Sequence, residues 1–101
     1  MRQVYIVTKC VYEQAYHTTP TSSERIVKVL DDYHKAVVYI CGRIKEDHEW
    51  IDSLNNVSAT YTKHEPNPDK IEEGIFVTSF EYNENSCYEE HSYIFRSYDV
   101  E

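Results

Sequence analysis

Residues 75–82, IFVTSFEY, and residues 92–100, SYIFRSYDV, decide the fold of this chain. In each segment successive side chains belong alternately to two faces, and aromatic residues such as Phe76 and Phe80 recur on one face at every second or fourth position. A period of two is typical of β-strands. Residues 83–90 between them are polar and acidic and predict a loop. The end of the chain is therefore predicted to form two antiparallel strands.

Two more strands are predicted upstream of this pair. Residues 4–12, VYIVTKCVY, form a β-branched run that is apolar on both faces, which is typical of a central strand. Residues 57–62, VSATYT, alternate as a half-exposed strand does. The prolines in residues 66–69, PNPD, predict a turn rather than strand pairing.

The middle of the chain predicts helix. Thr21 and Glu24 have the spacing of a capping box, so a helix is expected to begin at Thr21. Apolar residues follow at helical spacing from Ile26 to Ile44. Gly42 is expected to break this helix, and a second helix is expected from about residue 45 to 55. Residues 36–41 have β propensity as well, so helix and strand both remain open for them.

Strands grouped apart from helices predict an α+β fold, with an antiparallel sheet of about four strands and one or two helices packed on one face. The length of 101 residues predicts a single domain over residues 1–101. The last strand is expected to form an open edge of the sheet, and an exposed edge can pair with a second copy. A self-assembling structural or accessory protein of phage or bacterial origin, for example a homodimer, is therefore one alternative function.

The net charge of −8 is confined to the second half of the chain. Residues 1–50 carry seven acids and seven bases, whereas residues 51–101 carry eleven acids and three bases. An acidic chain without a cluster of bases is not expected to bind nucleic acid directly or to bind an anionic membrane surface. The charge favours a basic protein partner instead.

Three cysteines far apart predict free thiols in a reducing compartment rather than a disulfide scaffold. The first residues show no signal peptide, and no apolar run has the roughly 20 residues of a membrane span. These features predict a cytoplasmic protein.

Ten tyrosines accompany the acids, and tyrosine is enriched at binding hot spots. Tyrosine beside carboxylate is suited to recognising arginine and lysine through ion pairs and cation–π contacts. The predicted partner-binding residues are Glu72, Glu73, Tyr82, Glu84, Tyr88, Glu89 and Glu90. Reversing the charges of Glu84, Glu89 and Glu90 is expected to weaken a complex more than reversing Glu13 and Glu24.

Enzymatic motifs are weak in this sequence. Cys87 and His91 are spaced C-x3-H, and Cys10 and His17 are the residues that would complete a zinc site. This pattern supports a small metal-dependent enzyme as a further alternative. The chain has no phosphate loop, dinucleotide fingerprint or nucleophile elbow, so we expect no catalysis and no cofactor.

In size, charge and tyrosine content the chain resembles the small acidic proteins with which phages and mobile elements block host nucleases, of which anti-CRISPR proteins are an example. The resemblance rests on the acids between residues 65 and 101 and the interleaved tyrosines, and no motif transfers a residue role by position. It implies an inhibitor that docks on a basic nuclease or another nucleic-acid-binding protein, as a nucleic-acid mimic does.

Overall fold

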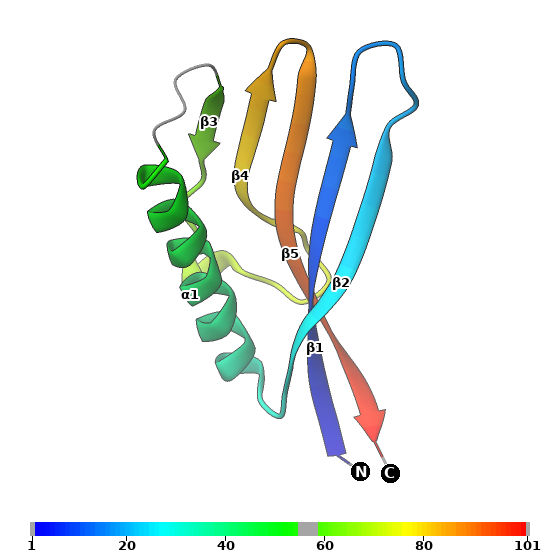
Figure 1. Cartoon of the computed structure of the whole chain (residues 1–101). Helices are drawn as coiled ribbons and strands as arrows, with labels where there is room; N and C mark the ends of the chain where they lie inside the picture. The colour runs from blue at the N-terminus through cyan, green and yellow to red at the C-terminus, as the bar shows by residue number, and fades with distance from the viewer. Residues whose placement is uncertain (1, 55–58, 101) are drawn as a thin grey trace.

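The computed structural model describes residues 2–54 and 59–100. They form one antiparallel sheet with a long helix packed on one side of it (Figure 1). The elements in chain order are β1 (Arg2–Gln14), β2 (Thr21–Leu30), α1 (Tyr33–Asp52), β3 (Thr60–Lys63), the 3-10 helix η1 (Pro68–Lys70), β4 (Val77–Glu84) and β5 (Cys87–Val100). The strand order is β2-β1-β5-β4-β3. The predicted α+β class is confirmed, with five strands rather than about four.

The fifth strand is β2, and here the predicted helix start at Thr21 is wrong. Residues 21–30 pair with β1 in a hairpin in which Cys10 lies opposite Glu24 and Tyr5 opposite Leu30. The local spacing of Thr21 and Glu24 suits a capping box, but the segment RIVKVL at residues 25–30 is rich in β-branched residues. Pairing with the neighbouring strand therefore overrides the local helix signal.

A single helix, α1, replaces the two that the sequence predicts. Asp32 is its N-cap, because the Asp32 side chain accepts a hydrogen bond from the Lys35 backbone N–H at 3.0 Å. Residues 36–41, which the sequence leaves open between helix and strand, are helical. Gly42 lies within the helix and does not break it. Residue 55, where the second helix was expected to end, lies outside the described residues, as do residues 57 and 58 of the strand predicted at 57–62.

The last strand is not an edge, which corrects the prediction that its open edge pairs with a second copy. β5 pairs with β1 on one side and β4 on the other, so it is the central strand. β2 and the short β3 form the two edges of the sheet. Burial explains this placement, because residues 92–95 of β5 are all buried.

The core lies between α1 and one face of the sheet. Ala36, Val37, Ile40 and Ile44 recur at helical spacing and pack against Val7, Tyr93 and Phe95 of the two central strands, with Ile71 closing the cluster. This spacing explains why α1 forms where it does, since it places one apolar stripe on the sheet. Among the described residues no helix is both long enough and apolar enough to cross a membrane.

A polar network lies at the edge of this core. The Asp47 carboxylate on α1 accepts hydrogen bonds from the Tyr93 hydroxyl at 2.8 Å and the Ser79 hydroxyl at 2.9 Å. Lys9 Nζ lies 3.9 Å from Asp47 Oδ1 and above the Tyr93 ring. Burial lowers the pKa of Lys9, and Asp47 opposes that shift. The network therefore ties α1 to three strands of the sheet.

Candidate protein-binding surface

Several acids and tyrosines gather at one end of the sheet, which we call the acidic hairpin end. The β1–β2 and β4–β5 turns lie side by side there, beyond the C-terminal end of α1 (Figure 1). We define the acidic hairpin end by Glu13 of β1 and by six residues of the β4–β5 hairpin: Glu81, Tyr82, Glu84, Tyr88, Glu89 and Glu90. At this end Glu13 is exposed and the six hairpin residues are half-buried.

The hairpin turn itself differs from the predicted loop over residues 83–90. The strands continue to Glu84 and resume at Cys87, so only Asn85 and Ser86 form the turn. Both have positive φ, at 45° and 69°, as a two-residue hairpin turn requires. The acids of this segment therefore sit in a fixed register instead of on a loose loop.

That register forms two carboxylate pairs, one on each face of the sheet. Glu90 lies opposite Glu81 of β4, and Glu89 lies opposite Glu13 of β1. Residues directly opposite on antiparallel strands have Cα atoms about 4.5–5.5 Å apart, and like charges at that spacing destabilise the sheet. Residues 12–14, 60–62, 81–84 and 87–90 include no lysine or arginine. No lysine or arginine at these strand positions therefore neutralises the carboxylates.

Tyrosine hydroxyls order these carboxylates. The Tyr88 hydroxyl donates to Glu81 and lies 3.0 Å from Glu90, and the Tyr82 hydroxyl donates to Glu84. The hydrogen bond to Glu84 raises the pKa of Tyr82 to about 12. Burial and the bonds to Glu81 and Glu90 raise the pKa of Tyr88 as well. Both tyrosines therefore stay neutral donors that hold carboxylates in place.

Two histidines also contact the acidic hairpin end. His64 Nε2 lies 2.6 Å from Glu81, and His91 Nε2 lies 3.1 Å from Glu89. Hydrogen bonds from Tyr88 and His64 lower the pKa of Glu81, so this carboxyl is held in its charged form. The His91 ring stacks on Phe80 at 4.2 Å between centroids, which fixes its position beside the acids.

Five of the seven predicted binding residues lie together here: Tyr82, Glu84, Tyr88, Glu89 and Glu90. Glu72 and Glu73 do not join them. The Glu73 carboxylate accepts a hydrogen bond from the Ser97 backbone N–H at 2.5 Å, toward the opposite end of β5, and this bond lowers the Glu73 pKa. The predicted set therefore falls at two separate places on the sheet.

Sequence reasoning missed Glu13 and Glu81. Glu13 belongs to the charge-balanced half of the chain and was chosen as a remote control, yet it faces Glu89. Glu81 is one of the acids between residues 65 and 101 on which the resemblance rests, but it was not among the predicted binding residues. Only the pairing of β1 with β5 reveals that Glu13 adds to the acidic hairpin end.

The zinc-site alternative finds no support in this geometry. Within the described part of the chain, no three His, Cys, Asp or Glu side chains are placed to hold a metal ion. Cys87 and His91 lie on one strand, and four residues of strand span about 13 Å, which is too far for two ligands of one ion.

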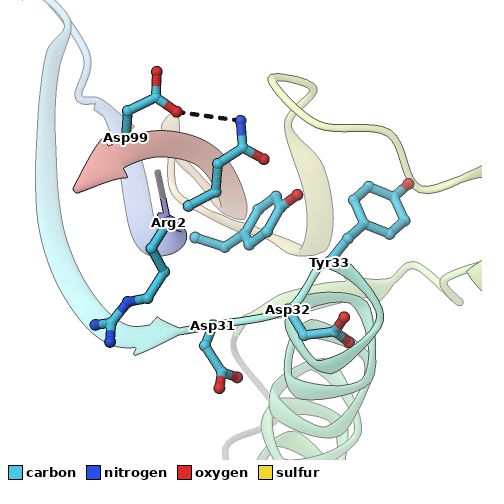
Figure 2. A pocket seen from close by; sticks show the side chains of 7 residues that line it. Arg2, Asp31, Asp32, Tyr33 and Asp99 are labelled. Atoms are coloured by element: carbon cyan, nitrogen blue, oxygen red, sulfur yellow. Dashed lines mark hydrogen bonds between the residues drawn. The ribbon is translucent and has the colours of Figure 1, made fainter. Parts of the chain in front are cut away.

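A hollow of about 580 Å³ lies at the opposite end of the sheet (Figure 2). Arg2, Tyr5, Tyr33 and three aspartates line it, but each aspartate already has a partner. Asp31 pairs with Lys35, Asp32 caps α1, and Asp99 accepts from Gln3. Since its acids serve the fold and it is wide open, this hollow is a weaker candidate than the acidic hairpin end.

Comparison of the chain with protein-family models, curated proteins and solved structures gave no match.

Proposed function

We propose that this chain is a protein-binding inhibitor whose acidic hairpin end docks on a basic nucleic-acid-binding protein, such as a nuclease. The observation that carries the proposal is the pair of like-charge contacts, Glu81 opposite Glu90 and Glu13 opposite Glu89. Such contacts cost stability, and a basic partner is what would offset that cost.

The tyrosines strengthen the proposal. Because Tyr82 and Tyr88 donate their hydroxyls to carboxylates, the acids are already ordered before a partner arrives. Ordering in advance lowers the entropy cost of binding. Tyr12 lies beside Tyr88 with ring centroids 6.2 Å apart and is exposed, so it offers a ring face to a guanidinium group.

The shape of the acidic hairpin end suits a groove. A narrow β-hairpin that projects past the helix can enter a cleft lined by arginine and lysine, where its carboxylates would occupy the positions of phosphates. Binding of this kind excludes nucleic acid without catalysis. In this way an acidic chain would act on nucleic-acid metabolism without contacting nucleic acid itself.

The test compares two variants with equal charge change. One replaces Glu84, Glu89 and Glu90 by Lys; the control replaces Glu49 of α1, Asp69 of η1 and Glu72 by Lys, none of which belongs to the acidic hairpin end. Binding to a fluorescent oligo-arginine peptide is measured by anisotropy at low and moderate salt. We expect the hairpin variant to raise Kd at least about tenfold and the control by less than about threefold. Equal effects would refute the localisation.

A further inference from the structure

The second face of the sheet carries apolar side chains that neither α1 nor η1 covers. On the two central strands the residues that point away from α1 include Ile6, Thr8 and Cys10 of β1 and Ile94 and Arg96 of β5. Ile26 of β2 and Phe76 border the same face. We call this surface the uncovered face.

The uncovered face has the character of an interface. The side chain at its centre is buried, since Ile94 is only 5% exposed. The side chains at its borders project into solvent, with Ile26 62%, Phe76 53% and Tyr98 50% exposed. Two hollows of about 300 and 330 Å³ lie between these ridges and adjoin at Glu24. Several large apolar side chains exposed on one surface are typical of binding surfaces. Ridges and hollows on one surface allow it to pack against a copy of itself.

Two opposite charges are placed symmetrically on this face. Arg96 lies opposite Ile6 in the register, and Glu24 lies opposite Cys10. Thr8, the residue midway between Ile6 and Cys10, therefore lies midway between the two charges. Arg96 forms no ion pair within the described residues, and the Glu24 carboxylate accepts a long hydrogen bond from Cys10 Sγ at 4.0 Å.

We propose that the uncovered face binds a second copy of this chain, as a two-fold symmetric dimer. A two-fold axis that lies in the interface and passes over Thr8 brings Arg96 of each copy to Glu24 of the other. The symmetric contact is self-complementary, as a two-fold interface must be. Arg96 would repel a basic partner, and Glu24 would repel an acidic one. A second copy supplies a charge opposite to each of these residues and therefore fits this face better than a partner of one charge.

The area of the face approaches that of a stable dimer interface. Four strand widths over ten residues give a plane of roughly 600 Å², before side-chain relief is counted. Stable interfaces bury about 800 Å² on each partner. The proposed interface is centred on Thr8, and Glu90, about 13 Å along the sheet, lies at its border because it lines the 330 Å³ hollow, so the dimer would partly cover this side of the acidic hairpin end.

The test measures the mass of the full chain by sedimentation over a range of concentrations. The variants are Arg96→Glu, Glu24→Arg, the double exchange of both residues, and Lys28→Glu as a control of equal charge change to Arg96→Glu. Circular dichroism checks that each variant folds. We expect a wild-type dimer that persists at high salt, because its contacts are mainly apolar.

Each single reversal is expected to raise the dimer dissociation constant at least about tenfold, because symmetry places two like-charge contacts in the interface. The double exchange is expected to restore the dimer, and Lys28→Glu to leave it unchanged. A wild-type chain that stays monomeric at all concentrations would overturn the proposal. The proposal would also be overturned by a dimer whose dissociation constant is unchanged by the charge reversals and in which backbone amides of β2 become protected from hydrogen exchange. That result would indicate pairing of edge strands.

Discussion

Glu13 of β1 lies directly opposite Glu89 of β5, although the two residues belong to opposite ends of the chain. The pair joins the first strand to the β4–β5 hairpin and adds a fifth carboxylate to the acidic hairpin end. Two like charges in this position oppose the pairing of the strands that carry them. Their presence fits a surface arranged for a partner better than one arranged for stability.

Relief of this repulsion should stabilise the fold. We expect Glu13→Lys to raise the free energy of unfolding by about 0.5 kcal/mol, because a like-charge pair becomes an opposite-charge pair. Urea unfolding of the wild type and variant measures the difference. The same variant should bind the oligo-arginine peptide more weakly. A variant that loses stability while retaining full binding would argue against a functional acidic hairpin end.

Asp47 is expected to be critical for stability. Asp47→Ala removes the acceptor of Tyr93 and Ser79 and leaves Lys9 without its counter-charge in a site where Lys9 is 15% exposed. We expect a loss of about 3 kcal/mol in urea unfolding. Asp31→Ala, which breaks the exposed pair with Lys35, is the control and should have a far smaller effect. Similar losses in both variants would show that the buried network around Asp47 contributes no more to stability than an exposed ion pair.

The titration of Tyr82 offers a direct check of its hydrogen bond. Its pKa is raised to about 12, so the proton is held more tightly in the folded chain than in the unfolded chain. The bond therefore contributes stability below pH 10, and this contribution is lost as the pH rises toward 12. The absorbance difference between wild type and Tyr82→Phe should show tyrosinate forming near pH 12. A transition near pH 10 would mean that Glu84 does not accept a hydrogen bond from the Tyr82 hydroxyl.

Gly42 lies in the interior of α1 with no atom within 4 Å of a Cβ at that position. Gly42→Ala is therefore expected to raise the free energy of unfolding by about 0.5–1 kcal/mol, because alanine favours the helix. Gly74, with φ of +82°, is the matched control, and Gly74→Ala should destabilise the chain. Thermal unfolding of both variants tests the assignment, and destabilisation by Gly42→Ala would place this residue in a kink instead.

Local patterns predicted the strands of the second half well, because residues 75–82 and 92–100 alternate and pair with near neighbours in the chain. The helix predicted at Thr21 failed for the opposite reason. The spacing of Thr21 and Glu24 satisfies a helix cap locally, and only pairing with β1 decides for a strand. The helix break predicted at Gly42 failed in a similar way. Packing of Ile40 and Ile44 on the sheet stabilises the helix on both sides of this glycine.

For the candidate surface, sequence proximity identified the hairpin acids but also grouped Glu72 and Glu73 with them. The sheet separates these two from the hairpin acids and brings Glu13 in from the first strand. Neither change follows from local pattern, because both depend on β5 lying between β1 and β4. The order of strands, which is set by long-range pairing, is what the sequence alone leaves undetermined.

The most direct test of the central claim is affinity capture from a bacterial lysate at low salt with three baits. These are the wild-type chain, the variant with Glu84, Glu89 and Glu90 replaced by Lys, and the control with Glu49, Asp69 and Glu72 replaced by Lys. We predict that a basic nucleic-acid-binding protein is captured by the wild type and the control, is released by salt and by excess duplex DNA, and is absent from the hairpin variant. Capture of the same protein by all three baits would contradict the claim, as would capture of no basic protein by the wild type.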